Sequence, residues 1–443
     1  MIGARDHSLI ELDAKPLPSW PARLVGRRPV ASLAGRDRAL SEQITVGVVK
    51  HLLFLQHLLV HHSGRTLRQI DPLVQKILCI GLYQLCFLKR IPAHAAVSQA
   101  VDQARRFGRA RAAGFVNAVL RKAAREPDPP LPDPATDPAS YAALALSHPP
   151  ELYQLAQTTL GKRRALSFCV HNNGEPPTIV RLLPGARVED LSAEGIAVQP
   201  HSQPLMYVVE GAKRSLLADW SLRGIAQAQD PTSAAVVEHL DLAGGMTVLD
   251  RCCGMGTKTM QMAERVGPSG RVIAMDLAAE RCDRLRELLA ARNIANVQVF
   301  CASRVGQLPR AAPHLFDRVL VDAPCGNSGV LARRPEARYA QTGSRLRSLA
   351  QVQDQILDDT APCVAPGGRL VYATCSIWPA ENEDRVQNFL SRHQGWQLLD
   401  QRLVAPNSEG GPTHYHDGGY WAALGRADVA PSTVQTASLP DTP

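Results

Sequence analysis

Two cysteines stand at equivalent places in the carboxyl-terminal half of the chain, each at the end of a short apolar run. Cys325 follows the run Asp317–Asp322 in the sequence Asp-Ala-Pro-Cys, and Cys375 closes the run Leu370–Cys375. A thiolate is both a nucleophile and a soft metal ligand, so a pair of thiols indicates covalent catalysis, a disulfide or a metal site. No Cys-x2-Cys pair or His/Cys cluster accompanies them, which disfavours a metal site. Taken alone, each cysteine could also be a small buried hydrophobic residue.

Both apolar runs belong to a series of short strands that alternate with helical patterns from Gln227 onward. The predicted helices include Lys258–Val266 and Ala279–Arg292. The predicted strands are Met246–Asp250, Arg271–Asp276, Val297–Cys301, Asp317–Asp322 and Leu370–Cys375. Such alternation is typical of a doubly wound, mostly parallel sheet that binds ligands at the carboxyl ends of its strands. We therefore expect Cys325 and Cys375 to meet in one cleft beside a cofactor.

The first predicted strand leads into a glycine-containing turn that is typical of a cofactor-binding loop. Asp250 ends the strand, and residues 251–259 read Arg-Cys-Cys-Gly-Met-Gly-Thr-Lys-Thr. Glycine lets the backbone approach a ligand, and a helix start offers free N–H groups. The spacing excludes the phosphate-binding loop Gly-x4-Gly-Lys-Ser/Thr. A tight turn without a ligand is the alternative.

The second predicted strand ends in an acid, Asp276. A carboxylate at this place can accept hydrogen bonds from both hydroxyls of a ribose, which suits a nicotinamide or an S-adenosylmethionine enzyme. Capping of the following helix is the alternative for Asp276. A nicotinamide dehydrogenase is disfavoured because no Gly-x-Gly-x2-Gly follows the first strand.

The amino-terminal region combines helical periodicity with positive charge. Apolar residues between Val74 and Leu85 recur on one face of a helix, and similar patterns over residues 36–125 predict a bundle of several helices. Residues 1–125 hold 20 Lys or Arg and 7 Asp or Glu, whereas the rest of the chain holds 29 and 34. The net charges of +13 and −5 predict a polyanion partner held mainly by the first region, with solvated helix faces as the alternative. The basic residues that cluster at its end are Arg105, Arg106, Arg109, Arg111, Arg121, Lys122 and Arg125.

Composition also predicts the domain boundaries. Six prolines between residues 126 and 140 predict a stiff, extended linker. The expected divisions are a helical domain over 1–125, the linker over 126–140, a small α/β subdomain over 141–226, a catalytic domain over 227–426 and a disordered tail over 427–443.

Overall composition narrows the class of protein. A chain of 443 residues that is 45% hydrophobic and 20% charged is neither disordered nor fibrous. Ten cysteines are too few for a disulfide scaffold. No secretory pattern opens the chain, and no uninterrupted apolar run reaches the roughly 18 residues of a spanning helix. We therefore expect a soluble cytoplasmic protein.

The motifs around the two cysteines resemble those of the RNA 5-methylcytosine methyltransferases of the Sun/RsmB family. The matching stretches are Asp322–Cys325, Thr374–Ser376 with Glu381–Glu383, Asn172–Asn173 before Arg181, and Gln229–Asp230 near Ser233. The amino-terminal region resembles the NusB-like RNA-binding domain of such proteins through Arg36–Asp37, Gly81–Gln84 and Asn117–Arg121. The resemblance covers nearly the whole chain. It implies an all-α NusB-like bundle followed by a Rossmann-like α/β methyltransferase domain with a small α/β subdomain in front.

The resemblance also implies an activity, a cofactor and a partner. The activity is S-adenosylmethionine-dependent methylation of cytosine C5, with 16S ribosomal RNA or a small-subunit assembly intermediate as partner. Cys375 would add to C6 of the cytosine, and Cys325 would assist release of the product. Asp322 would hydrogen-bond the N3/N4 edge of the base, and Lys258 would lower a thiol pKa or orient the base. We expect a monomer, without a metal and without a membrane partner.

The cofactor site carried over from the family departs from its usual pattern. Met255 replaces a proline and Thr257 replaces a glycine of the first loop. Ala302 stands where the family offers an aspartate to the adenine, with Ser303 as the nearest polar substitute. The carried-over residues are Cys252, Cys253, Gly254, Met255, Gly256, Thr257, Lys258, Asp276, Ala302, Ser303 and Asp322.

Two other functions remain alternatives. One is a non-catalytic RNA-binding assembly factor whose cofactor loop has decayed. The other is an amino-group methyltransferase, whose usual Asn/Asp-Pro-Pro-Tyr motif does not match Asp322–Cys325.

Overall fold

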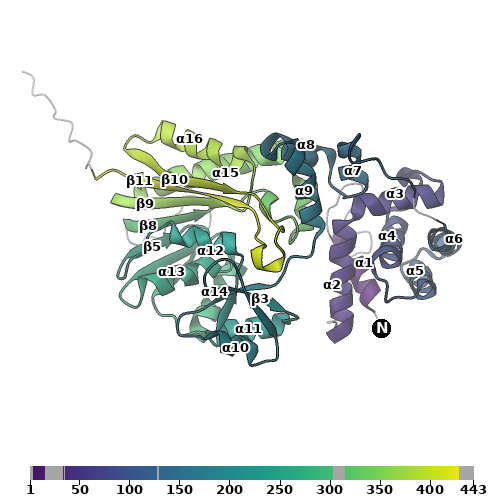
Figure 1. Cartoon of the computed structure of the whole chain (residues 1–443), viewed down its shortest axis with the longest axis horizontal. Coiled ribbons are helices and arrows are strands. Elements are labelled where there is room, and N and C mark those ends of the chain that lie inside the picture. Colours follow the sequence, from purple (N-terminus) through teal and green to yellow (C-terminus); the bar gives the residue numbers. More distant parts are fainter. Residues whose placement is uncertain (1–2, 15–32, 34, 127–128, 303–314, 429–443) are drawn as a thin grey trace, which may run out of the picture. The chain divides into compact units, whose positions relative to one another are not determined.

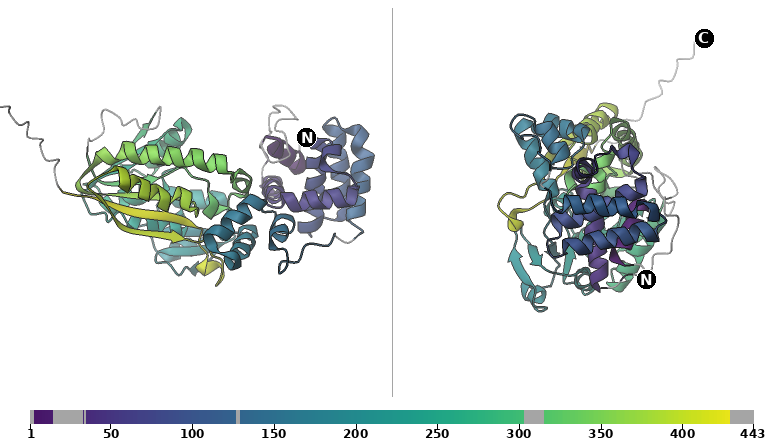
Figure 2. Two further views of the ribbon diagram at one scale, coloured as in Figure 1. Left: turned by 90° about the horizontal axis from the view of Figure 1, so that it is seen from above. Right: turned by 90° about the vertical axis from the view of Figure 1, so that its right-hand side faces the viewer.

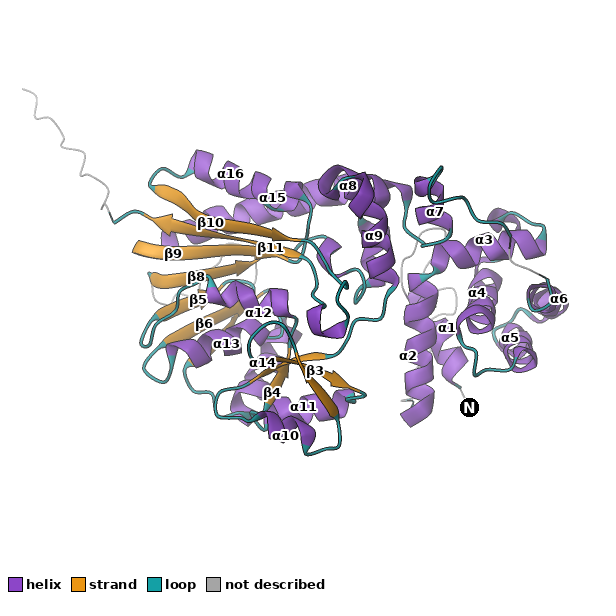
Figure 3. Ribbon diagram, in the orientation of Figure 1, coloured by secondary structure: helices purple, strands orange, loops and turns teal. Residues whose placement is uncertain are grey.

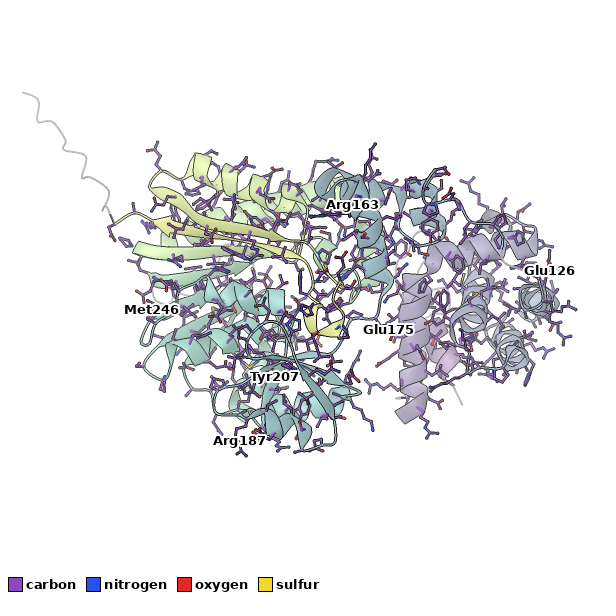
Figure 4. All side chains as sticks on the ribbon, in the orientation of Figure 1. Glu126, Arg163, Glu175, Arg187, Tyr207 and Met246 are labelled. Carbon is purple, nitrogen blue, oxygen red and sulfur yellow. The ribbon has the colours of Figure 1, made fainter. Side chains whose placement is uncertain are left out.

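The protein forms two compact units. The computed structural model describes residues 3–14, 33, 35–126, 129–302 and 315–428 (Figure 1). Unit 1 comprises Met1–Glu175 and Leu331–Thr342, and unit 2 comprises Pro176–Val330 and Gly343–Pro443. The chain therefore crosses between the units three times, first after Glu175, which is labelled in Figure 4.

Unit 1 contains helices and no strand among its described residues. Its elements are α1 (Ala4–Ala14), α2 (Gly35–Lys50), α3 (Leu52–Ser63), η1 (Leu67–Gln69), α4 (Pro72–Phe87), α5 (Ala93–Arg106), η2 (Ala110–Ala112), α6 (Ala113–Ala123), α7 (Pro138–Leu144), α8 (Pro150–Leu160), α9 (Lys162–Asn173) and η4 (Pro335–Ala340). The helices α2 to α6 lie against one another as a bundle in both views of Figure 2. The helical bundle predicted for residues 36–125 is confirmed.

Helix α4 forms the centre of this bundle because it is apolar on almost every side. Asp71 accepts hydrogen bonds from the N–H groups of Leu73 and Val74, and Pro72 occupies the first turn, so the start of the helix is well capped. Residues of α1 to α6 share one apolar core. Lys76 is buried on α4 and forms an ion pair with the buried Asp13 of α1 at 2.7 Å.

The division between the units falls inside the small α/β subdomain predicted for residues 141–226. Helices α7 to α9 belong to unit 1, because their loops bond to the bundle: Ser147 Oγ accepts from the Phe54 N–H at 2.9 Å. The segment 331–342, predicted within the catalytic domain, also belongs to unit 1. It carries the buried Arg338, which donates to the Lys50 carbonyl at 2.9 Å and to Asn173 Oδ1 at 2.8 Å.

Unit 2 contains a seven-stranded sheet in the order β10-β11-β9-β8-β5-β6-β7 (Figure 3). Its strands are β5 (Thr247–Asp250), β6 (Arg271–Asp276), β7 (Val297–Cys301), β8 (Phe316–Asp322), β9 (Val364–Thr374), β10 (Trp396–Val404) and β11 (Gly419–Arg426). Strands β5 to β9 are parallel and β11 is antiparallel to both of its neighbours. The five predicted strands and the doubly wound class are confirmed. The β10–β11 hairpin was not predicted: β10 is mostly exposed and lacks an apolar run, and the buried apolar run of β11 was not identified.

Helices cover both faces of this sheet (Figure 1). One face packs against α12 (Pro231–Glu238), α13 (Thr257–Val266) and α14 (Ala279–Ala291), and the other against α15 (Gly343–Thr360) and α16 (Glu383–Arg392). Successive strand residues alternate between the faces: Val248 joins the first core and Leu249 joins the second. Such a sheet leaves the carboxyl ends of its strands open for a ligand.

A second, four-stranded antiparallel sheet in the order β2-β3-β1-β4 completes unit 2. Its elements are β1 (Ile179–Leu182), α10 (Val188–Ser192), β2 (Ala197–Pro200), β3 (Met206–Glu210), α11 (Arg214–Leu222) and β4 (Ala226–Ala228). Arg181 of β1 donates to Gln229 Oε1 and to Glu264 Oε2 of α13, both at 2.9 Å. The motif residues Arg181 and Gln229 therefore fasten the small sheet to the helix that follows the glycine loop.

Three other sequence predictions concern the linker, the tail and membrane-spanning helices. Residues 129–137 of the predicted linker form neither helix nor strand, and α7 begins at Pro138. The predicted tail lies, from residue 429 on, outside the described residues, as does Ser303. In the described part of the chain, no single helix is long and apolar enough to cross a membrane, and α2 with α3 passes that test only as a pair bent by 80°.

Candidate functional site

The two cysteines lie side by side. Cys325 follows β8 and Cys375 follows β9, and these neighbouring strands are parallel, so both loops emerge at the same edge of the sheet. The distance between the two Sγ atoms is 3.2 Å. Cys325 is buried and Cys375 is half-buried, and both are free thiols. The sequence-based expectation that the two thiols meet in one place is met by this geometry.

Asn327 joins the loops of the two cysteines. Its side-chain Nδ2 donates to the Cys325 carbonyl at 3.1 Å, and its Oδ1 accepts from the Cys375 thiol at 3.2 Å. Its backbone has φ of +61°, a left-handed conformation that asparagine tolerates better than most residues. No sequence motif had pointed to Asn327, although an asparagine in a Cys-Gly-Asn turn is the available signal.

Two residues of the motif Glu381–Glu383 form hydrogen bonds with the loops that carry Cys325 and Cys375. Glu381 is fully buried, and its Oε1 accepts from the Gly326 N–H at 2.8 Å. Asn382 Oδ1 accepts from Thr374 Oγ1 at 2.6 Å, and its Nδ2 donates to the Ser376 carbonyl at 3.0 Å. One residue of the motif therefore holds the Cys325 loop and the next holds the residues on either side of Cys375. The sequence identified this motif but not its role.

The two thiols share one electrostatic environment. The hydrogen bond with Cys375 raises the pKa of Cys325 well above its usual range, and burial, the charge of a Cys375 thiolate and the charge of Glu381 raise it further. Two acidic groups in contact cannot both ionise easily. The raised pKa keeps Cys325 protonated, so Cys325 can donate to Cys375 Sγ while Cys375 donates to Asn327 Oδ1.

A lysine lies close to the pair. Lys258 Nζ of α13 is 2.7 Å from Asp322 Oδ2 at the end of β8. Burial lowers the pKa of Lys258, but the negative charge of Asp322, their hydrogen bond and the charge of a Cys375 thiolate outweigh burial and raise it. Lys258 is therefore an ammonium ion that stabilises negative charge on both of these neighbours.

A cavity of about 350 Å³ lies at the carboxyl ends of β5, β6 and β8, and its wall includes Pro324, the residue before Cys325. This volume lies within the usual range for small-ligand sites, roughly 300–1,000 Å³. Its walls combine carboxylates, a guanidinium and apolar side chains. The lining residues are Arg251, Cys252, Gly254, Asp276, Leu277, Ala278, Arg281, Asp322, Pro324, Val352 and Ile356. Burial raises the pKa of Cys252 to about 12, so this thiol stays neutral and does not compete as a nucleophile.

The predicted cofactor residues fall into two groups. Cys252, Gly254, Asp276 and Asp322 line the cavity, whereas the other described ones do not. Cys253 packs in an apolar cluster with residues of α13 and α14, and Met255 points into solvent with 51% of its surface exposed. The remaining three loop residues begin α13, and Gly256 there has φ of +83° with no room for a Cβ atom beside Leu285.

Asp276 holds the loop as well as lining the cavity. Its Oδ2 accepts from the Gly254 N–H at 3.0 Å, and its Oδ1 accepts from the Ala278 N–H at 2.8 Å. The capping role that was the alternative for this residue is therefore present too. Ala302 is buried in the core and bonds to the Asp276 carbonyl through its N–H at 2.9 Å, so its side chain does not reach the cavity.

Asp250 gives unit 2 a pH-dependent stability. This residue is buried beneath the loop, where Thr259 Oγ1 donates to it at 2.6 Å, and burial raises its pKa to about 7. The unfolded value is near 3.9, so the native state binds more protons between these values and stability falls as pH rises through them. We expect the free energy of unfolding of the wild type to fall by roughly 2 kcal/mol between pH 5 and pH 8 because of this group. Asp250→Asn has no carboxyl group at this position and should not show that decrease.

Urea unfolding at the two pH values measures this effect. Asp283→Asn on the exposed face of α14 is the matched control, and its pH dependence should follow that of the wild type. Equal pH dependence of the Asp250→Asn variant and the wild type would contradict the prediction.

Comparison with known proteins gives two family matches. Residues 237–424 match the model described as 16S rRNA methyltransferase RsmB/F, and residues 27–125 match the NusB family. The first match contains both cysteines and the cavity. The second covers most of the helical bundle.

Individual relatives match over most of their length. The chain is 32% identical to the ribosomal RNA small subunit methyltransferase B of Pseudomonas putida, over 88% of this chain and 90% of the relative. It is 29% identical to the probable ribosomal RNA small subunit methyltransferase B of Bacillus subtilis, over 84% of each chain.

Solved structures share the fold. The crystal structure of PH0851 has a TM-score of 0.73 at 24% identity and covers 88% of this chain and 90% of its own. NSun6 from Pyrococcus horikoshii, solved with SFG, has a TM-score of 0.52 at 18% identity and covers 64% of this chain and 99% of its own. The predicted combination of a helical domain and a Rossmann-like methyltransferase domain is confirmed.

Proposed function

This chain belongs to the 16S rRNA methyltransferase RsmB/F family, and from that premise we propose that it methylates C5 of a cytosine in 16S ribosomal RNA through a covalent bond to Cys375. The observation that carries the proposal is the 3.2 Å contact of the two thiols at the edge of the sheet where Asp322 and Pro324 line a cavity. Methylation of cytosine at C5 needs such a thiol, because C5 becomes nucleophilic only after a group has added to C6.

The cavity fits S-adenosylmethionine, the cofactor of this family. Leu277, Val352 and Ile356 offer apolar surface for a flat ring, and Asp276 offers a carboxylate that can accept hydrogen bonds from the ribose hydroxyls. Gly254 lies on the glycine loop at the wall of the cavity and leaves its backbone open to a ligand. When bound, the cofactor supplies an electrophilic methyl group on sulfur.

C5 of cytosine is too weak a nucleophile to take a methyl group by itself. Addition of the Cys375 thiolate to C6 forms the Sγ–C6 bond and moves the electrons of the C5=C6 bond toward C5, which becomes enamine-like. C5 can then form its bond to the methyl carbon, and the bond between that carbon and the sulfonium sulfur would break with its electron pair left on sulfur. Removal of the proton at C5 restores the double bond as the Sγ–C6 bond breaks, and Cys375 leaves as a thiolate.

The shared environment of the two thiols supports different roles for them. Before the addition, Cys325 stays protonated and can donate a hydrogen bond to Cys375 Sγ, the atom that attacks C6. After the methyl group has been transferred, the proton on C5 needs an acceptor. We assign that role to Cys325, which gives its own proton to water first. The different roles of the two thiols therefore rest on their contact and on the greater burial of Cys325.

Lys258 and Asp322 assist the base and the thiolate. Asp322 can accept a hydrogen bond from the N4 amino group of cytosine, and Lys258 lies within 2.7 Å of that carboxylate. The ammonium ion of Lys258 is bonded to Asp322 and can stabilise negative charge that develops on the attacking sulfur.

RNA is the partner that the charge of the chain supports. The net charge of +13 over residues 1–125 suits the phosphates of an RNA, and the target base must leave its stack to reach a cleft at the edge of a sheet. A loop or a locally opened helix of ribosomal RNA meets that requirement.

Methylation of a 16S ribosomal RNA transcript tests the proposal. With S-adenosylmethionine, the purified chain is expected to produce 5-methylcytosine, which bisulfite sequencing detects as a cytosine that resists conversion. Isothermal titration with S-adenosylhomocysteine measures cofactor binding separately. A chain that binds RNA, yet neither binds the cofactor at millimolar concentration nor methylates, would be the assembly factor considered as an alternative.

A further inference from the structure

Four of the seven basic residues in the cluster at the end of the helical bundle form ion pairs with acidic neighbours. The ion pairs are Arg105 with Asp102 at 3.5 Å, Arg106 with Asp6, Arg109 with Asp71 at 2.9 Å, and Lys122 with Glu126 at 3.7 Å. Glu126 is labelled in Figure 4 just beyond α6. These four cations have part of their charge satisfied within unit 1, so they are the weaker candidates for holding a polyanion.

Two arginines at the end of α6 have no such acidic partner among the described residues. Arg121 Nε donates to the neutral Asn117 Oδ1, and Arg125 Nε donates to the Arg121 carbonyl, both at 3.1 Å. Each bond occupies only one of the five N–H groups of a guanidinium. Arg111 also lacks an acidic partner in the described residues, but it lies on η2 and not in the groove between α5 and α6.

Arg121 and Arg125 line one groove of unit 1. The groove has a volume of about 480 Å³ and runs between α5 and α6, which lie side by side. Its apolar surface comes from Val97, Val101 and Ala124, and its polar surface from His94, Ser98 and Asn117. Two cations with free donors therefore stand at the edge of an apolar floor that has hydrogen-bonding groups along its wall.

We propose that this groove is a subsite for one nucleotide of the RNA, with Arg121 and Arg125 on the phosphates and the base over the valine floor. The inference rests on the proposed function, because it takes RNA as the substrate. A guanidinium offers paired N–H donors that match phosphate oxygens, and an apolar surface suits the face of a base. An acidic peptide would use the arginines but would leave the apolar floor and its polar wall without a role.

A pair of charge-matched double variants tests the role of the arginines. Arg121→Gln with Arg125→Gln removes the two groove cations, and Arg105→Gln with Lys122→Gln removes two exposed, ion-paired cations from the same helices. Binding to a single-stranded 12-nucleotide RNA is measured from 50 to 400 mM salt. The groove variant is expected to bind roughly tenfold more weakly at 0.1 M salt, with a salt slope lower by about 1.4. The control variant should change affinity less than threefold.

A third variant tests the floor without a change in charge. Ser98 is exposed on α5, so Ser98→Leu fills the groove while leaving the fold intact. It is expected to weaken binding about fivefold at an unchanged salt slope. The proposal would be overturned if both double variants lost RNA affinity equally. It would also be overturned if Ser98→Leu bound RNA as tightly as the wild type. Competition by a glutamate-rich peptide at the affinity of the RNA would overturn it too.

Methylation by the wild-type chain separates this inference from the proposed function. If the wild type methylates 16S ribosomal RNA and the groove variants bind RNA normally, only the subsite is wrong. If the wild type binds RNA through the groove but forms no 5-methylcytosine, the proposed function fails and the subsite stands.

Discussion

A Cys375→Ala variant is expected to lose methyl transfer by more than roughly 10⁴-fold, which is the scale for removal of a covalent nucleophile. Without the Sγ atom no bond to C6 forms, and C5 stays too weak a nucleophile to take the methyl group. Cys375 is half-buried in a loop, so its truncation leaves the sheet intact. Incorporation of labelled methyl groups into 16S ribosomal RNA measures the loss. Cys86→Ala in α4 of unit 1 is the control thiol and should keep full activity.

A trapping experiment makes this first prediction sharper. In RNA that carries 5-fluorocytidine, a fluorine replaces the hydrogen that must leave C5 as a proton. The release step is therefore blocked, and the wild-type chain should remain bonded to the RNA on a denaturing gel. Cys375→Ala should form no such adduct. Methylation at the wild-type rate by this variant would overturn the assignment of the nucleophile.

A Cys325→Ala variant is expected to show the opposite behaviour toward the covalent adduct. Cys375 can still add to C6 and the methyl group can still transfer, but the proton at C5 has lost its base. Loss of a positioned base costs typically 10² to 10⁴-fold in rate, so turnover should fall by about that factor. Protein bonded to ordinary RNA, without fluorine, should therefore accumulate and appear as a slower band on a denaturing gel.

The double variant Cys325→Ala with Cys375→Ala is the control for the source of this adduct. It should show no slower band, because the bond to the RNA requires the sulfur at position 375. An inactive Cys325→Ala variant that forms no adduct would argue against a role in release. It would instead indicate that the 3.2 Å contact serves to hold Cys375 in its reactive form.

The catalytic sheet could be predicted in part because its central strands are buried on both faces. Strands β5, β6 and β8 are short apolar runs that end in acids, and this pattern survives without any knowledge of their neighbours. Strand β10 could not be predicted in the same way, whereas β11 is a buried apolar run that the sequence prediction missed. Most residues of β10 are exposed, and its place at the edge of the sheet depends on pairing with β11.

The domain boundaries could also be predicted only in part from the sequence. The run of prolines marked a break in composition, yet the compact units divide after Glu175 and the segment 331–342 returns to unit 1. That return depends on the buried Arg338, whose partners include the distant carbonyl of Lys50 and the side chain of Asn173. The hydrogen bond between Arg338 and Lys50 joins residues 288 positions apart, and no local sequence pattern indicates such a pairing.

The sequence by itself determined which groups could react. Cysteines at the ends of two apolar runs, an acid after the second strand and a lysine in the glycine loop are all local features, because strand and helix patterns are set by neighbouring residues. Tertiary structure alone decided how these groups influence one another. The bonds of Asn327 to both cysteine loops, the bond of Glu381 to Gly326 and the contact of the two thiols arise from distances across strands. Electrostatic and hydrogen-bond energies depend on those distances and on burial, and neither is written in the order of the residues.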